Sequence, residues 1–176
     1  FNSGFSRIDS MGGGSGWGGL IVGDNSETSA SLLGTSLADG SPLITLNGPA
    51  DVIVSNSQIL GSSGAEPLIR LTDSASGTMQ IVSTDLSYSA SHCIEAQGSA
   101  TLTLQQVSMQ SCDDNSIWAR GLPLSIDGLT VSQSVDLGGV TGELSNFVGN
   151  DLFVNNVDGF MMSEITISML IGSDNR

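Results

Sequence analysis

The chain has 176 residues and a formal net charge of -14, from four basic and 18 acidic side chains. All four basic residues are arginines, Arg7, Arg70, Arg120 and Arg176, so the clustered cations of a nucleic-acid-binding protein are absent. No apolar run approaches the ~20 residues that span a bilayer, which excludes a membrane-embedded helix. Charged residues make up 12% of the chain and hydrophobic ones 39%, so it can bury a core, and its length fits one domain.

A short segment with apolar residues at its first and third positions recurs along the chain. Six such segments follow one another at spacings of 25, 25, 23, 18 and 17 residues: Ile44–Leu46, Ile69–Leu71, Ile94–Ala96, Ile117–Ala119, Val135–Leu137 and Leu152–Val154. Leu20–Val22 precedes the first of them by 24 residues. Alternation of this kind predicts strands with one buried face.

Two further alternating pairs follow these segments. The second pairs are Val52/Val54, Met79/Ile81, Leu102/Leu104, Leu124/Ile126 and Phe160/Met162. The third pairs are Ser57/Ile59, Thr84/Leu86, Val107/Met109, Leu129/Val131 and Ile165/Ile167. Two residues always separate a second pair from a third, whereas the other connections vary in length; the unit that starts at Val135 is expected to lack a third strand. The corner has a fixed length but no recurrent Asn-Gly turn, which argues against β-hairpins. Helices are also disfavoured, because no part of the chain shows a sustained 3.6-residue period of apolar residues.

These repeats predict an all-β solenoid in which each circuit of three short strands, here called a rung, stacks on the next and like side chains form buried columns. Over residues 17–170 the chain resembles the right-handed parallel β-helix superfamily, the pectate-lyase-like solenoids. Gly16–Val22 is similar to the Trp-Gly-Gly strand that opens such solenoids in many secreted proteins. The resemblance implies a right-handed coil, the hand that parallel crossovers prefer.

We expect residues 1–176 to form a single β-helix domain, with residues 1–16 as an irregular cap or an earlier rung. The chain starts at Phe1, without an initiator methionine or a signal peptide. It is therefore expected to be a mature or trimmed piece of a longer protein.

The outward positions of the first strands place opposite charges side by side. Arg70 and Glu95 are expected to be neighbours, because stacked strands lie about 4.8 Å apart, and Arg120 is expected to reach Glu95 as well. One interpretation is a surface ion-pair ladder of small energetic weight. The other is a glycan-binding or partner-binding patch in which Trp118 and Phe153 flank these charged side chains.

The two cysteines predict a disulfide. Cys93 directly precedes Ile94 and Cys112 lies five residues before Ile117, so both fall at the variable edge of the coil, one rung apart. A bond between them would clip consecutive rungs and would need an oxidising compartment. Free buried thiols are the alternative, because the two positions are not equivalent within their rungs.

We predict no catalytic, cofactor-binding or metal-ligating residues. Asp113-Asp114 is a carboxylate doublet of the kind that polygalacturonase-type β-helices use, but their Asn-x-Asp, Gly-His-Gly and Arg-x-Lys motifs are missing. His92, the single histidine, lies beside Cys93 and matches neither a catalytic triad nor zinc-ligand spacing. Calcium is a weak expectation that rests on loop aspartates alone: Asp24, Asp39, Asp73, Asp113, Asp114, Asp151 and Asp158.

The functional expectation is an extracellular, non-enzymatic structural or adhesive module of a surface protein, sheath or fibre. Its partners would be further copies or neighbouring domains of the same chain, which pair through the coil ends because open sheet edges tend to pair. The apolar segment around Met161, Met162 and Met169 favours such docking. The alternative is a polysaccharide-binding or polysaccharide-cleaving β-helix, as in tailspikes.

Overall fold

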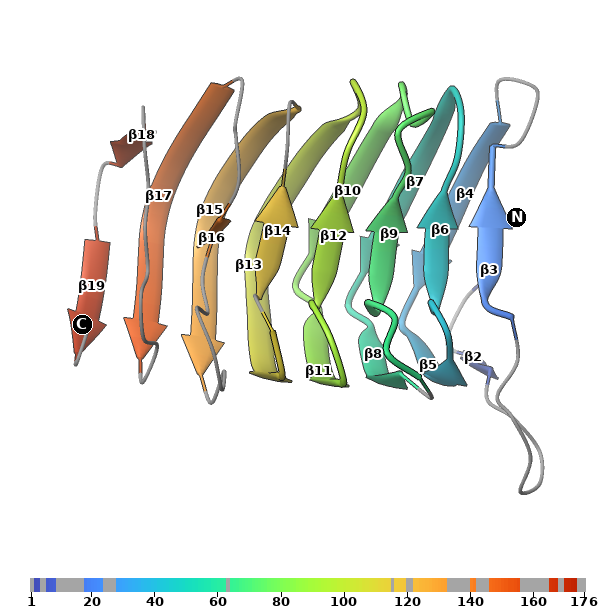
Figure 1. Ribbon diagram of the computed structural model, residues 1–176, viewed down its shortest axis with the longest axis horizontal. Coiled ribbons are helices and arrows are strands. Elements are labelled where there is room, and N and C mark those ends of the chain that lie inside the picture. The colour runs from blue at the N-terminus through green and yellow to red at the C-terminus, as the bar shows by residue number, and fades with distance from the viewer. Residues whose placement is uncertain are drawn as a thin grey trace.

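Parallel strands stack into a β-solenoid, seen side by side along the long axis of the computed structural model (Figure 1). The structure describes residues 2–3, 6–8, 18–23, 28–62, 64–114, 116–119, 122–132, 140–141, 146–155, 165–167 and 170–173. In this part every regular element is a strand, and no helix is long and apolar enough to cross a membrane. The prediction of an all-β parallel solenoid is confirmed.

The first strands of the rungs form a six-stranded sheet, drawn in front in Figure 1. They are β3 (Leu20–Val22), β6 (Ile44–Leu46), β9 (Ile69–Leu71), β12 (Ile94–Ala96), β14 (Ile117–Ala119) and β16 (Val140–Thr141). Ile44 pairs with Ile69, which pairs with Ile94. The alternation of apolar residues therefore sets the register as predicted.

The second and third strands belong to one 13-stranded sheet. The second strands are β1 (Asn2–Ser3), β4 (Thr28–Leu33), β7 (Ala50–Ser55) and β10 (Thr78–Val82). The third strands are β2 (Ser6–Ile8), β5 (Thr35–Gly40), β8 (Gln58–Ser62) and β11 (Asp85–Ser89). Strands that run through the corner join both sets: β13 (Thr101–Cys112), β15 (Pro123–Ser132) and β17 (Asn146–Asn155). Beyond them, β18 (Ile165–Ile167) and β19 (Leu170–Ser173) both pair with β17.

Columns of aliphatic side chains fill the interior. Ile44, Ile69, Ile94 and Ile117 are fully buried in the first column. The predicted second pairs Val52/Val54, Met79/Ile81 and Leu102/Leu104 are also buried, as are the hydroxyls of Ser57 and Thr84 at the start of the third strands. Each rung thus buries its apolar face only because its neighbours stack on it.

The two-residue corner between second and third strands is held by left-handed backbone. Gly34, Asn56, Ser83 and Gln106 stack there with φ between 46° and 56°. Corner carbonyls accept both a backbone N–H from the neighbouring rung and a buried hydroxyl. Ser55 O accepts from Gly34 N at 2.9 Å and from Ser57 Oγ at 2.8 Å, and Val82 O accepts from Asn56 N at 3.0 Å and from Thr84 Oγ1 at 2.8 Å. The fixed corner length therefore reflects a repeated local geometry.

The C-terminal strand assignments from sequence were wrong. Trp118 pairs with Thr141, so the next first strand is β16, which begins at Val140. The sequence analysis placed this strand at Val135, a residue outside the described part of the chain. Leu152 pairs with Leu129, which places Leu152–Val154 among the third strands. Ile165 pairs with Phe147, so Ile165–Ile167 is a second strand, and Leu170 pairs with Leu152 as the third. Phe160 and Met162 lie outside the described residues.

Replacing Gly77 by alanine should lower the free energy of unfolding by about 2–3 kcal/mol. A Cβ at this position would lie 1.9 Å from Ala50 O, in the backbone of the rung before, so strands β7 and β10 would have to separate. Gly18→Ala is the matched control, because its Cβ would meet nothing within 4 Å. Urea unfolding measures both; equal effects would contradict the close backbone approach.

Candidate functional site

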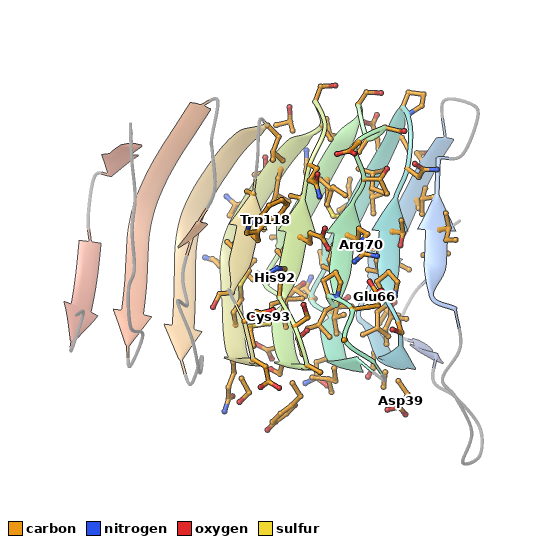
Figure 2. The ribbon with its side chains drawn as sticks, viewed as in Figure 1. Asp39, Glu66, Arg70, His92, Cys93 and Trp118 are labelled. Carbon is orange, nitrogen blue, oxygen red and sulfur yellow. A yellow bond between two sulfur atoms is a disulfide. The ribbon has the colours of Figure 1, made fainter. Side chains whose placement is uncertain are left out.

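The outward face of the six-stranded sheet gathers the residues singled out as a candidate patch. Strand register places Thr45, Arg70, Glu95 and Trp118 in one column across β6, β9, β12 and β14. Each lies between two buried residues of its three-residue strand, so each points outward and is half-exposed. Figure 2 shows Arg70 and Trp118 over this sheet.

Arg70 is held by two carboxylates. Its Nε and Nη2 donate to Glu95 Oε2 at 3.0 and 2.8 Å, and Nη2 also contacts Glu66 from the corner before β9. Burial alone would lower the pKa of Arg70, but Glu95 and Glu66 raise it above its usual value. The predicted Arg70–Glu95 pair is confirmed, and the guanidinium charge is balanced within the protein.

Polar contacts extend this cluster along the sheet. Gln97 Nε2 donates to Glu95 Oε1 at 3.1 Å, and Thr72 Oγ1 donates to Asn47 Oδ1 at 2.7 Å one rung away. These side chains hold one another in place on a pleated surface. The face is therefore an ordered, polar surface suited to contact a partner.

His92 adds an aromatic ring that the sequence analysis did not place on this face. Its imidazole lies parallel to the Trp118 indole, with an angle of 12° between planes and 6.1 Å between ring centroids (Figure 2). The corner after β11 carries His92 beside β12, whereas Trp118 comes from β14. In the sequence, only the position of His92 two residues before Ile94 indicates that it lies near this face. The stacking of its ring on Trp118 leaves no sequence pattern, because the two residues come from different rungs.

His92 should make the protein less stable as the pH falls from about 7 to 5. Burial lowers the pKa of His92, while Asp114 and Glu95 oppose that shift and Arg70 adds to it. The unfolded chain therefore takes up the proton first, near the ordinary pKa of about 6.5, and folding stability is lost below that pH.

Thermal unfolding of the wild type and of His92→Gln across this pH range tests the effect. The carboxylates are common to both proteins, so the difference between the two curves isolates the histidine. The variant should show a flatter pH dependence, and parallel curves would contradict the expected shift.

Two residues of the expected patch are not placed on this face. Arg120 lies outside the described residues, so its predicted reach to Glu95 is untested. Phe153 pairs with Thr130 in the 13-stranded sheet, so its assignment to the column of Trp118 was wrong. The error follows from the Leu152–Val154 segment, whose apolar alternation fits first and third strands equally well.

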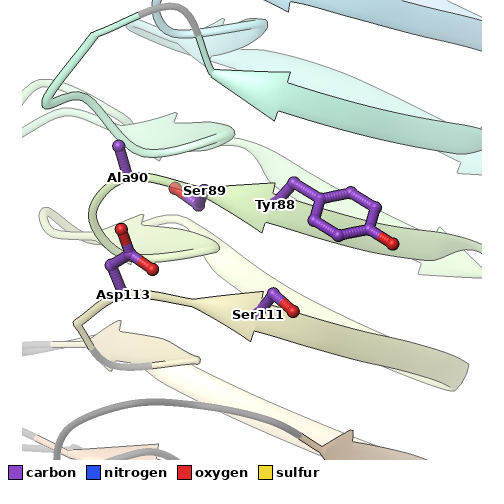
Figure 3. Close-up of a pocket in the computed structure, with 5 residues that line it drawn as sticks. All are labelled: Tyr88, Ser89, Ala90, Ser111 and Asp113. Carbon is purple, nitrogen blue, oxygen red and sulfur yellow. The ribbon is translucent and has the colours of Figure 1, made fainter.

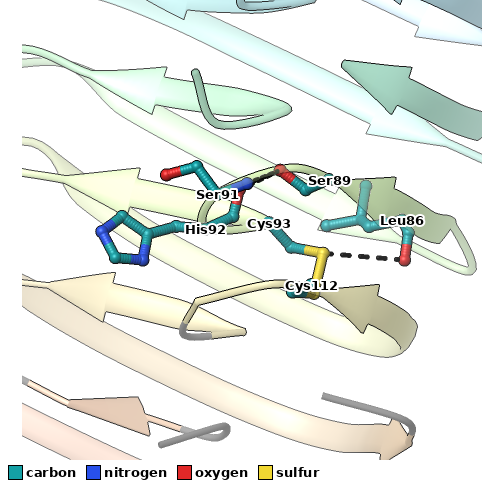
Figure 4. Close-up of a disulfide and its surroundings, with 6 residues drawn as sticks. All are labelled: Leu86, Ser89, Ser91, His92, Cys93 and Cys112. Atoms are coloured by element: carbon teal, nitrogen blue, oxygen red, sulfur yellow. Dashed lines mark hydrogen bonds between the residues drawn. A yellow bond between two sulfur atoms is a disulfide. The ribbon is translucent and has the colours of Figure 1, made fainter. Parts of the chain in front are cut away.

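Cys93 and Cys112 form a disulfide beside this face (Figure 4). Their Cα atoms are 5.4 Å apart, both residues are fully buried, and the described part of the chain has no free cysteine. The predicted disulfide is confirmed, but its expected place between consecutive rungs was wrong. Cys93 lies just before β12 and Cys112 ends β13, so the bond closes one rung on itself. Ser89 Oγ accepts from Ser91 N at 3.3 Å and donates to His92 O at 2.7 Å, which ties the same corner to the backbone.

The acidic candidates that the structure describes with their side chains do not converge on a metal site. Asp113 and Asp114 are exposed in the corner after β13, where Ser91 Oγ donates to Asp114 Oδ2 at 3.5 Å. Among the described residues, no group of three or more histidine, cysteine, aspartate or glutamate side chains is arranged to hold a metal ion. Asp24 and Asp158 lie outside that part of the chain.

The structure therefore offers one ordered polar face with an aromatic pair and a disulfide-braced corner beside it. Hydrophobic columns occupy the interior between the described first, second and third strands. Any ligand of this part of the chain must bind on the outer surface, because the core is filled. Scans of protein-family models, curated proteins and solved structures found no match to the chain.

Proposed function

We propose that the protein is an extracellular, non-enzymatic structural or adhesive module of a surface protein, sheath or fibre. The observation that carries the proposal is the continuous stacking of filled rungs from β3 to β14. Such a coil is a stiff body with repetitive outer faces, and its interior is filled by side chains that stabilise the stacking of the rungs. The resemblance of the sequence to pectate-lyase-like solenoids supports the architecture alone. We do not extend it to an enzymatic activity.

Charge and cysteine chemistry support an extracellular location. The buried Cys93–Cys112 disulfide is of the kind that persists in oxidising compartments. A net charge of -14 keeps a surface protein soluble at high concentration. Expression with and without export to an oxidising compartment tests this point: the exported protein should carry the disulfide quantitatively and have the higher yield.

Self-association through a coil end is part of the proposal. In the described structure β3 is the last strand of the six-stranded sheet, and Leu20 N and Val22 O bond to the β6 side. Residues alternate in the direction of their backbone groups along a parallel strand, so the N–H and C=O of Ile21 point away from β6. No described strand pairs with this edge of β3, so these groups can extend the sheet into a second copy.

Ile21→Pro tests this assembly. Proline removes the outward N–H without removing a bond to β6, so it should abolish assembly while the fold is retained. Ile21→Ala keeps the N–H and is the control. Light scattering and electron microscopy should show elongated assemblies for the wild type and for Ile21→Ala only; dispersed monomers of all three proteins would contradict the proposal.

Glycan binding at the six-stranded sheet is a second candidate function. The parallel rings of His92 and Trp118 beside Arg70 and Glu95 favour it, since aromatic faces and fixed polar groups suit sugar rings. Trp118→Ala should then lose glycan binding, whereas Thr45→Ala in the same column should retain it. A glycan panel that binds neither the wild type nor Thr45→Ala would remove this candidate.

A further inference from the structure

The outward face of the six-stranded sheet brings an aromatic ring and a fixed polar pair within reach of one sugar ring. Glu95 pairs with Trp118 across β12 and β14, so their Cα atoms lie about 4.8 Å apart. Both side chains point outward, and the imidazole of His92 lies parallel to the indole (Figure 2). A hexose ring that covers the Trp118 indole therefore also meets Glu95.

A pocket of about 200 Å³ at the ends of β11 and β13 brings no such groups together. It is lined by Tyr88, Ser89, Ala90, Ser111 and Asp113 (Figure 3). The ring of Tyr88 points away from Asp113, so one ligand would not share the aromatic and the charged group. The face of the six-stranded sheet is therefore the more complete site.

Arg70 and Glu95 keep hydrogen-bonding capacity toward a ligand. The side chains are 30% and 20% exposed, so a ligand can reach both. Arg70 contacts Glu95 and Glu66 through Nε and Nη2, which leaves the N–H groups of Nη1 without a contact among the described residues. Within the same part of the chain, Glu95 Oε1 accepts only from Gln97 Nε2, so it can accept a further proton. Sugar hydroxyls both donate and accept, and these two fixed groups match them.

The charge of this face is negative. One arginine, Arg70, contacts two carboxylates, Glu66 and Glu95, so one negative charge is left over. Burial lowers the pKa of His92, so its imidazole is uncharged at neutral pH and does not offset that charge. Asp114 acts electrostatically on His92 and adds a further negative charge. An anionic sugar would therefore be repelled, and it would find no unpaired cation on the described part of this face.

We infer, resting on the candidate glycan function above, that the ligand of this face is a chain of neutral sugars and that uronates are excluded. The Trp118 indole packs against the apolar face of one sugar ring, while Arg70 Nη1 and Glu95 Oε1 bind its hydroxyls. Glu66 sets the specificity without touching the ligand. It cancels guanidinium charge that would otherwise attract the carboxylate of a uronate.

Matched pairs of oligosaccharides test the ligand class. Oligomers of glucose, galactose and mannose are each compared with the corresponding uronate, which carries a carboxylate in place of the C6 hydroxymethyl group. Calorimetry should show binding at least about tenfold tighter for the neutral member of the pair that binds. High salt should leave the neutral affinity unchanged and should narrow the difference, because it screens the repulsion.

Glu66→Gln tests the source of the selectivity. It removes one negative charge beside Arg70 and keeps the shape of the side chain, so uronate affinity should rise about three- to tenfold while neutral affinity stays the same. Asp85→Asn is the matched control. It removes the same charge from an exposed position on the 13-stranded sheet and should leave both affinities unchanged.

Equal or tighter binding of the uronate to the wild type would overturn the inference and leave glycan binding standing. If Arg120→Gln then abolished uronate binding, a second arginine would be the cation that the inference excludes. Equal gains for Glu66→Gln and Asp85→Asn would also overturn it, because net charge alone would then set the selectivity. Binding of no member of any pair would remove the candidate glycan function itself, and the ligand class with it.

Discussion

Replacing Ile94 by alanine should lower the free energy of unfolding by about 3–4 kcal/mol. Ile94 is fully buried and pairs with Ile69 on one side and Ile117 on the other. The truncation leaves a cavity in the middle of the column, and the neighbouring rungs cannot close it without breaking their strand register. Urea unfolding at neutral pH measures the loss.

Ile53→Ala is the matched control for Ile94→Ala. Ile53 is also a strand isoleucine, but it points outward from β7 and is 41% exposed. Its truncation should cost about 0.5 kcal/mol or less. Equal losses at the two positions would show that burial in the column does not set the stability of the coil.

Removing the disulfide should cost a further large share of the stability. Cys93→Ala/Cys112→Ala is expected to lower the free energy of unfolding by about 3 kcal/mol, because the unfolded chain loses a closed ring of about 20 residues. Both cysteines are fully buried, so lost packing adds to the effect. Denaturant unfolding compares the double variant with the wild type.

Reduction provides the control for the double variant. Wild-type protein unfolded in the presence of a strong reductant should approach the stability of the double variant, and the variant itself should not respond to the reductant. If the oxidised wild type and the double variant had the same midpoint, the bond would not constrain the unfolded chain as proposed.

The central rungs could be predicted from sequence because the signal there repeats. Ile44, Ile69 and Ile94 recur at nearly constant spacing, and each is followed by two further pairs with the same two-residue corner. Burial of one face of each strand leaves a single register that satisfies all three pairs. The disulfide could also be expected, since Cys93 and Cys112 enclose about one rung.

The C-terminal rungs could not be assigned correctly because a three-residue alternation is short. Val135 and Leu152 begin segments with apolar first and third positions, whereas Val140 is followed by Thr141 and Gly142 and does not show the pattern. The correct choice keeps a spacing of 23 residues from Ile117 to its partner Val140, and it restores a two-residue corner before Leu152. The nearly constant number of residues per rung predicts the strand positions better than the apolar pattern of a single segment does.

The conformation of the corners depends on geometry that residue types do not encode. Ser83, Gln106 and Tyr88 adopt positive φ although nothing in their intrinsic preferences favours it, because stacking on neighbouring corners imposes that backbone. His92 similarly reaches Trp118 from a corner of variable length. The positions of the side chains in the corners therefore could not be predicted from the sequence and became clear only in the folded structure.

Hydrogen bonds between rungs run along the long axis, so tension along this axis loads one interface after another. Each rung that peels away would lengthen the chain by about 80 Å, from its 23–25 residues at roughly 3.4 Å each. The ring closed between Cys93 and Cys112 would release only a small part of that length. Under load the protein would extend rung by rung. The rung closed by the disulfide would extend less than the others when the bond is oxidised and as much as the others when it is reduced.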